Sequence, residues 1–150
     1  WEENGMKIRI ALCAAGLLAG MGVARADGLD PIAVRQTAMG LTGGAFGLLR
    51  AVVAAKGDVK PLEAPAKAIA RWATMIPAAY PPGSDKGGET KALPEIWSDR
   101  AGFEKRAREM GDAATRVAVA AKAGDAETVA AETKLLGEQC SGCHKAYRAR

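Results

Sequence analysis

The sequence Cys140-Ser141-Gly142-Cys143-His144 lies close to the end of the 150-residue chain. It has the form C-x-x-C-H, in which two thiols three positions apart are followed at once by an imidazole, and this is the attachment sequence of a c-type haem. Cys140 and Cys143 can add to the two vinyl groups of one porphyrin, and His144 can then ligate the iron. His144 is the single histidine of the chain, so no other imidazole competes for that iron. The motif therefore predicts one haem c, attached covalently through both cysteines.

Three other interpretations of the same residues have to be weighed. A thioredoxin-like C-x-x-C should lie near a βαβ pattern, and the sequence shows no strand-like alternation. A structural zinc site needs four ligands, usually in two pairs, whereas only three soft ligands lie together here. A simple disulfide between Cys140 and Cys143 remains open in an oxidising compartment, but it leaves the adjacent His144 without a role. Covalent haem explains all three side chains.

The first 26 residues have the pattern of a secretory signal peptide. Basic residues follow Met6, an apolar run covers 10–23, and Ala24-Arg25-Ala26 has the A-x-A form of a cleavage site. We therefore expect residues 1–26 to be upstream residues plus a cleaved signal peptide, and residues 27–150 to form one exported, periplasmic domain without a membrane span. Export suits haem attachment, which in bacteria takes place outside the cytoplasm.

Composition excludes some classes of function. The formal net charge is only +4 and the charges are scattered, so the sequence indicates neither nucleic-acid binding nor a strongly basic docking surface. Outside the haem motif it contains no arrangement of acid, base and nucleophile that would indicate an enzyme. We expect a non-enzymatic haem protein.

Hydrophobic periodicity predicts four helices and no strands. Asp30 and Pro31 have the cap and first-turn positions of a first helix that ends at Lys56-Gly57, with Gly57 expected in the left-handed conformation. A second helix is predicted from about 64 to 76, a long loop over 78–94, a third helix from about 96 to 123, and a fourth after Asp125. This order predicts an all-α, antiparallel up-down four-helix bundle that encloses the haem.

Glycine is unusually frequent in the first predicted helix. Gly40, Gly43, Gly44 and Gly47 each lower helix propensity by about 1 kcal/mol relative to Ala. Such a run needs a packing reason, and the sequence offers two: close approach to the flat cofactor, or contact with a second subunit.

At this level the chain resembles the class II c-type cytochromes, which are cytochrome c-prime and its low-spin relatives of the cytochrome c-556 type. The resemblance covers the whole mature chain. It is carried by the C-x-x-C-H followed by Tyr147-Arg148, by Arg35-Gln36, by Pro94-Glu95-Ile96-Trp97, and by Ala123-Gly124-Asp125. The family fold is a periplasmic four-helix bundle, often dimeric through its first two helices. The resemblance thus implies a homodimer and periplasmic redox partners.

The resemblance also implies a distal residue, four positions after Arg35, which here is Met39. In low-spin members a methionine at this position binds the iron opposite the histidine, an arrangement suited to electron transfer. We therefore expect a periplasmic electron carrier with His144 and Met39 as iron ligands. The alternative is a five-coordinate cytochrome c-prime that binds NO or other small gases, with Met39 as ordinary apolar lining.

Further site residues follow from the same resemblance. Arg35 and Gln36 lie one turn before Met39, where family members use this pair to reach a haem propionate, and a buried arginine needs an anionic partner. Glu89 and Thr90, in the long loop, match a segment that touches propionates in relatives. The alternative for Arg35 and Gln36 is an ordinary solvated helix face.

Overall fold

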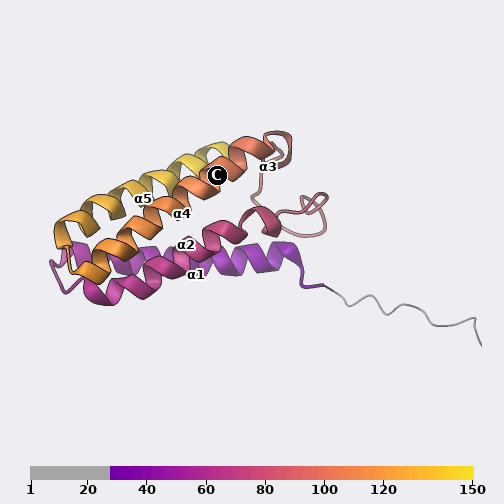
Figure 1. The fold of residues 1–150 in the computed structure, drawn as a ribbon. Coiled ribbons are helices and arrows are strands. Elements are labelled where there is room, and N and C mark those ends of the chain that lie inside the picture. The colour runs from indigo at the N-terminus through magenta and orange to yellow at the C-terminus, as the bar shows by residue number, and fades with distance from the viewer. Residues whose placement is uncertain (1–27) are drawn as a thin grey trace, which may run out of the picture.

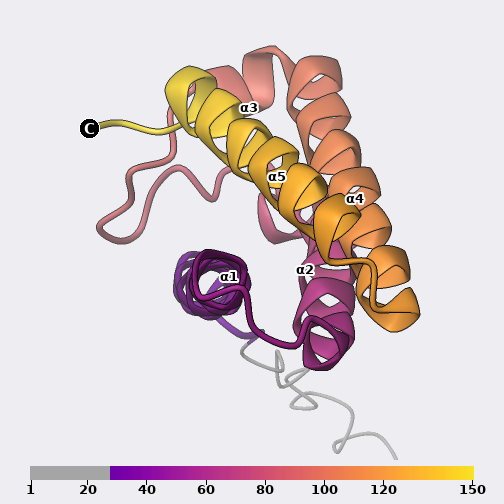
Figure 2. The same cartoon turned by 90° about the vertical axis from the view of Figure 1, so that its left-hand side faces the viewer.

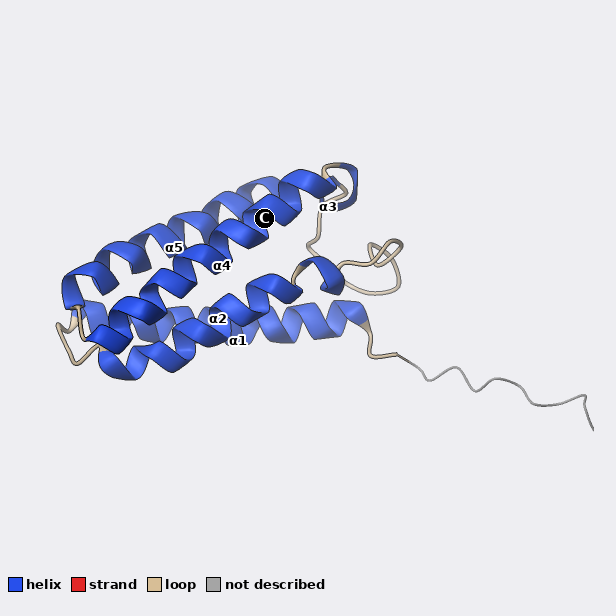
Figure 3. Cartoon of the chain, in the orientation of Figure 1, coloured by secondary structure: helices blue, strands red, loops and turns tan. Residues whose placement is uncertain are grey.

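The computed structural model describes residues 28–150, and the predicted signal peptide lies outside the described residues. The elements are α1 (Pro31–Ala54), the 3-10 turn η1 (Lys60–Leu62), α2 (Glu63–Met75), the 3-10 turn η2 (Pro77–Ala79), α3 (Glu95–Ser98), α4 (Arg100–Ala123) and α5 (Ala126–Tyr147). Figure 1 and Figure 3 show the four long helices running up and down, and residues 28–150 contain no strand beyond one isolated bridge. The predicted all-α four-helix bundle is confirmed.

The helices form a ring in which α1 packs on α2, α2 on α4 and α4 on α5. The pairing of α1 with α5 that closes the ring is the least extensive of the four. Figure 2, which looks almost along α1, shows this helix set apart from the closely packed α4 and α5. The bundle is therefore tight on the side of α2, α4 and α5, and open between α1 and α5.

Local chemistry accounts for the helix ends. The Asp30 carboxylate accepts hydrogen bonds from the Ile32 N–H at 2.9 Å and the Ala33 N–H at 3.3 Å, as expected for an N-cap. The left-handed residue after α1 is Lys56, with φ of 53°, and not Gly57 as the sequence indicated. The Gly57 N–H instead reaches back to the Val52 carbonyl at 3.0 Å, which closes the helix end one residue earlier than predicted.

The third predicted helix is divided in two by Asp99. This residue has φ of −113° and ψ of 55°, which interrupts the helix between α3 and α4. Its side chain accepts from the Gly102 N–H at 3.2 Å and so caps α4. At the other end of α4, Gly124 is left-handed with φ of 77°, and Asp125 caps α5 through the Thr128 N–H at 3.0 Å.

The core lies between α2, α4 and α5. One apolar face of α4 is buried, formed by Phe103, Met110, Ala114, Val117 and Ala121. The small residues allow close helix approach: a Cβ atom placed on Gly111 of α4 would lie 3.2 Å from the Cβ of Ala73 on α2. Leu49, Leu62, Ile69 and Leu136 fill the remaining volume, and each such side chain contributes about 1.5–3 kcal/mol through burial.

The helix α1 is apolar but largely exposed. Leu41 is 73% exposed and Leu48 is 49% exposed. A Cβ atom on Gly40, Gly43, Gly44 or Gly47 would have no neighbour within 4 Å, so these glycines pack against nothing in the described part of the chain. By length and composition α1 is also the one helix of residues 28–150 that could cross a membrane, a test that core helices of soluble proteins and signal sequences pass as well.

Candidate haem-binding site

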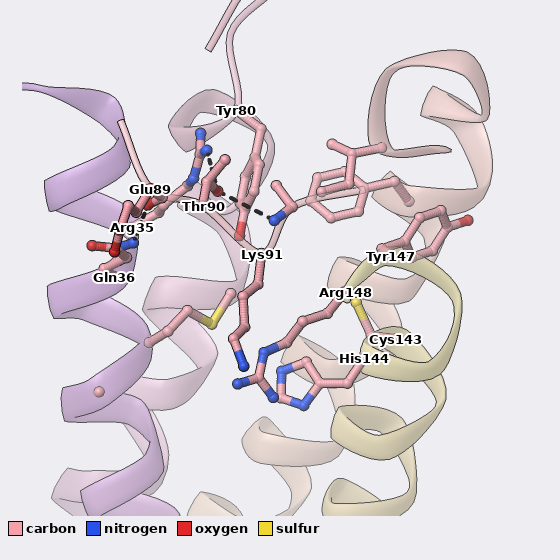
Figure 4. Close-up of a pocket in the computed structure, with 15 residues that line it drawn as sticks. Arg35, Gln36, Tyr80, Glu89, Thr90, Lys91, Cys143, His144, Tyr147 and Arg148 are labelled. Atoms are coloured by element: carbon pink, nitrogen blue, oxygen red, sulfur yellow. Dashed lines mark hydrogen bonds between the residues drawn. The ribbon is translucent and has the colours of Figure 1, made fainter. Parts of the chain in front are cut away.

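A cavity of about 590 Å³ opens between α1, α5 and the loop that precedes α3 (Figure 4). Its walls are formed by Arg35, Gln36, Met39, Gly40, Tyr80, Glu89, Thr90, Lys91, Ala92, Ile96, Phe103, Cys143, His144, Tyr147 and Arg148. The volume is in the range of small-molecule and cofactor sites. Seven of the eight predicted site residues line this one cavity, and Cys140 is the exception.

The C-x-x-C-H motif occupies the last turns of α5. Cys140 and Cys143 are half-buried free thiols, one helical turn apart, and no disulfide joins them. Burial raises the pKa of both thiols, that of Cys143 to about 11. Within residues 28–150 no group of three or more histidine, cysteine, aspartate or glutamate side chains is arranged to hold a metal ion.

His144 faces the mouth of the cavity from α5. Partial burial lowers the pKa of its imidazole, and the nearby Arg148 guanidinium lowers it further. The imidazole is therefore neutral at pH 7, which is the form that binds metal.

Met39 lines the cavity from α1 and is half-buried. It shares the cavity with His144 although the two residues lie on different helices. Phe46, seven residues further along α1, does not line the cavity. Its ring packs on α5 instead, where a Cβ atom on Gly137 would lie 3.0 Å from the Phe46 ring.

Arg35 is almost completely buried, at 2% exposure. Its guanidinium donates to the Ser84 hydroxyl at 2.9 Å, the Ser84 carbonyl at 2.8 Å and the Thr90 hydroxyl at 2.9 Å, and lies 4.6 Å from the centre of the Tyr80 ring. Gln36 donates to the Glu89 carbonyl at 2.8 Å. Arg35 is thus no solvated helix residue, because it ties the long loop to α1. Three of its five N–H groups are engaged, which leaves two for a further acceptor.

The same loop is tied to the end of α5. The Leu93 N–H donates to the Tyr147 carbonyl at 3.1 Å, and the Ala149 N–H donates to the Lys91 carbonyl at 2.8 Å, around the antiparallel bridge of Ala92 with Arg148. The sequence analysis did not predict this bridge. It also missed Tyr80, Ile96 and Phe103 as cavity residues, since nothing but their apolar character marks them.

Tyr147 connects the haem motif to the break between α3 and α4. Its hydroxyl donates to the Asp99 carboxylate at 2.7 Å, and its ring packs edge-on against Phe103 with 5.3 Å between ring centres. The hydrogen bond to Asp99 raises the pKa of Tyr147 to about 12, because ionisation would place a phenolate beside a carboxylate.

The raised pKa of Tyr147 makes the free energy of unfolding depend on pH in the alkaline range. The folded state holds the Tyr147 proton more tightly than the unfolded chain, whose pKa is about 10. The contribution to the free energy of unfolding is therefore complete below about pH 10 and is lost as the pH rises towards about 12. Between these values we expect urea midpoints to fall more steeply for the wild-type protein than for Tyr147→Phe. Equal slopes would contradict the assignment.

Fold and site together define a class of protein. A four-helix bundle with a C-x-x-C-H on its last helix, facing a cavity, has the residues that haem c requires. There are two thiols for the vinyl groups, a neutral imidazole for the iron, apolar and aromatic walls, and a buried guanidinium with free donors for an acidic substituent. The site fits a c-type haem of the class II arrangement.

Comparison with known proteins supports the assignment of a class II c-type haem site. The family model described as Cytochrome C' matches residues 30–148. The cytochrome c' of Rubrivivax gelatinosus is 32% identical over 121 residues, which cover 79% of this chain and 94% of the relative. Cytochrome c-556 of Agrobacterium tumefaciens strain II Chrys is 33% identical over 118 residues, covering 76% of this chain and 93% of the relative. The chain belongs to the cytochrome c' family, whose cofactor is a covalently attached haem c.

Solved structures show the same fold. Cytochrome c' from Thermochromatium tepidum has a TM-score of 0.76 at 30% identity, covering 81% of this chain and 95% of that one. A nitric oxide complex of a variant cytochrome c' from Alcaligenes xylosoxidans gives 0.72 at 32% identity, with 81% and 94% covered. A cytochrome c' characterised by ligand-controlled dimer dissociation gives 0.75 at 32% identity, with 81% and 95% covered.

Proposed function

We propose that this protein binds small neutral gases such as NO at a five-coordinate haem c, with Cys140 and Cys143 as the attachment points and His144 as the iron ligand. Haem c, when bound, supplies an iron atom that takes up such gases. The observation that carries the proposal is the part of the α1 wall formed by Met39 and Gly40, where the Met39 thioether has no hydrogen-bond donor and Gly40 has no side chain. An apolar wall favours a neutral diatomic molecule over an anion.

Two features of the chain's own residues and one comparison support this assignment. His144 offers a neutral imidazole. Arg35 and Gln36 are turned to the loop, where their hydrogen bonds to Ser84, Thr90 and Glu89 keep their polar groups apart from the Met39 wall. Relatives that share the fold include a cytochrome c' solved with nitric oxide. Arg35, with two free donors, is then the residue we propose to meet a propionate.

The second candidate is the electron carrier indicated by the sequence, with Met39 as the second iron ligand. It is favoured by one observation, that Met39 and His144 line the same cavity from opposite helices. A thioether and an imidazole on one iron raise its reduction potential and suit electron transfer. The similarity to cytochrome c-556 supports this candidate, and the more numerous similarities to cytochrome c' support the first.

Absorption spectra of the haem-loaded protein separate the two. For gas binding we expect a high-spin ferrous spectrum that changes at once when CO is added, with the same spin state in Met39→Ala. Met75→Ala is the control, because Met75 is 55% exposed on α2 and lies outside the cavity. A low-spin ferrous spectrum that resists CO, and that becomes high-spin only in Met39→Ala, would reject the proposal in favour of the electron carrier.

The proposal includes a cellular location and a class of partner. Residues 1–26 would direct the chain to the periplasm, where haem c is attached, and the mature protein would meet periplasmic redox partners there. The signal-peptide pattern and the membership of the cytochrome c' family support this location.

A homodimer through α1 and α2 is the second part of the proposal. An apolar groove of about 200 Å³ runs between these helices and is lined by Ala38, Leu41, Thr42, Ala45, Ala68, Ile69 and Trp72. Exposed Leu48 and Met75 extend the apolar surface along both helices. A contiguous surface of this kind is typical of an interface, and a cytochrome c' of the same fold is known for dimer dissociation.

Sedimentation equilibrium tests the dimer. Leu41→Asp should weaken self-association at least about tenfold, because it places a charge where an apolar side chain worth about 1.5–3 kcal/mol would be buried. Val119→Asp is the matched control, since Val119 on α4 is 67% exposed and lies away from the groove. Equal weakening by both variants, or a wild-type monomer at high concentration, would contradict the prediction.

A further inference from the structure

The charges that look scattered along the sequence gather around the mouth of the cavity. Figure 4 shows the Lys91 ammonium and the Arg148 guanidinium next to the His144 imidazole, although Lys91 lies more than fifty residues away in sequence. Both cations are exposed. Glu89, the one carboxylate among the cavity residues, is labelled on the α1 side of the same view, away from this group.

Two more cations extend the group over the surface of α4 and α5. Lys145 is exposed in the last turn of α5, directly after His144, and Arg148 is the extended residue that follows this helix. Arg106 of α4 reaches the haem motif, because a Cβ atom on Gly142 would lie 3.8 Å from its Nη1 atom. We call Lys91, Arg106, Lys145 and Arg148 the basic rim.

The basic rim is little neutralised. Arg106 pairs with Glu109 at 3.2 Å, whereas Lys91, Lys145 and Arg148 form no ion pair among residues 28–150. The rim is also held in place by the backbone, because the Ala149 N–H donates to the Lys91 carbonyl at 2.8 Å and the Ala92–Arg148 bridge fixes the neighbouring residue. Three unpaired cations on a fixed frame surround the exposed iron ligand.

We propose that the basic rim is the docking surface for an acidic one-electron carrier protein that reduces the haem iron. The inference rests on the proposed function, since ferric haem does not bind a gas such as CO and the iron must first be reduced to the ferrous state. One electron passes from the reduced carrier to ferric iron, and no covalent bond is formed or broken. Exposed charges around a site of close approach speed association and set its salt dependence, and they suit a brief encounter better than a stable complex.

The test uses the haem-loaded protein and two variants on α5. Lys145→Glu reverses a rim charge at a residue that does not line the cavity. Lys134→Glu is the control, because Lys134 is exposed on the same helix and nearly the same face, about 16 Å away along the axis. Poly-L-glutamate serves as the acidic probe for binding, and ascorbate and hexaammineruthenium(II) serve as small reductants of opposite charge.

We expect poly-L-glutamate to bind the wild-type protein at low ionic strength, to be released by about 0.1 M salt, and to slow the reduction of the iron by ascorbate. Lys145→Glu should weaken this binding about three- to ten-fold and lower the ratio of the ascorbate rate to the hexaammineruthenium rate by a similar factor. Lys134→Glu should change both quantities less than about twofold.

Three results would overturn the proposal: no binding of poly-L-glutamate at low salt, equal effects of the two variants, or binding that leaves the reduction rate unchanged. None of these measurements uses a gas. If the rim behaves as expected while CO fails to bind, the docking surface stands and the gas-binding function falls. If CO binds and the two variants behave alike, the gas-binding function stands and the docking surface is rejected.

Discussion

A protein in which Cys140 and Cys143 are both replaced by serine is expected to carry no covalently bound haem when it is produced in the periplasm with the haem-attachment machinery. Each thioether needs a thiol, and serine cannot add to a vinyl group under these conditions. The four helices should still form, because the packing of α2, α4 and α5 depends on buried residues such as Leu62, Val117 and Leu136 and not on the cysteines.

Haem staining after denaturing electrophoresis measures the covalent bond, and far-ultraviolet circular dichroism measures the helices. The control is Ser141→Ala, which changes an exposed residue between the two cysteines and should keep the stain at the wild-type level. A stained band from the double serine variant would contradict the assignment of both attachment points. A His144→Ala variant should retain the stain and lose the ligand, which separates attachment from ligation.

Replacing Arg35 by methionine is expected to lower the free energy of unfolding by about 2–4 kcal/mol, the cost of leaving buried hydrogen-bond partners unsatisfied. The substitution removes the three hydrogen bonds that hold Ser84 and Thr90 against α1. The loop should loosen more than the bundle, because Arg35 makes three of its hydrogen bonds to α1 and Gln36 makes one, to the Glu89 carbonyl.

Urea denaturation gives the stability change, and hydrogen exchange of residues 84–92 reports the loop itself. Arg50→Met on the same helix is the control, since Arg50 is exposed and makes no hydrogen bond or ion pair with its side chain in the described structure. Arg35→Lys should restore only part of the loss, because an ammonium group cannot reproduce the planar fork that reaches both Ser84 and Thr90. Unchanged exchange in Arg35→Met would show that the loop does not depend on this residue.

Much of the fold could be predicted because its signals are local. Asp30 and Asp125 are N-caps, Pro31 begins α1, and α4 ends at Ala123, as the sequence indicated. The errors were local too. Lys56 takes the left-handed conformation that Gly57 was expected to take, and Asp99 divides the third predicted helix. In both places several residues could end the helix, and local propensity alone does not choose between them.

The candidate site could be predicted as far as its residues belong to the C-x-x-C-H motif or match the class II cytochrome pattern. Cys143, His144, Met39, Arg35 and the loop residues Glu89 and Thr90 were named from the sequence, and all line one cavity. Arg35 was expected to bind a haem propionate. In the structure its guanidinium also donates to the hydroxyl and the carbonyl of Ser84, a contact that no sequence pattern predicted. Ser84 is a common loop residue, and its burial becomes visible only when the loop is folded onto α1.

The sequence alone determined the cofactor, the number and order of the long helices, and the family, because each depends on residues that are close neighbours along the chain. C-x-x-C-H acts within one helical turn, and helix caps act within three residues. Only the tertiary structure decided which residues from different helices and loops face one another. It placed Met39 and His144 in one cavity, joined the loop to α5 through the Ala92–Arg148 bridge, and gathered the basic rim from a loop and two helices. These contacts join residues tens of positions apart, and nothing in the local sequence encodes which distant side chain will be the partner.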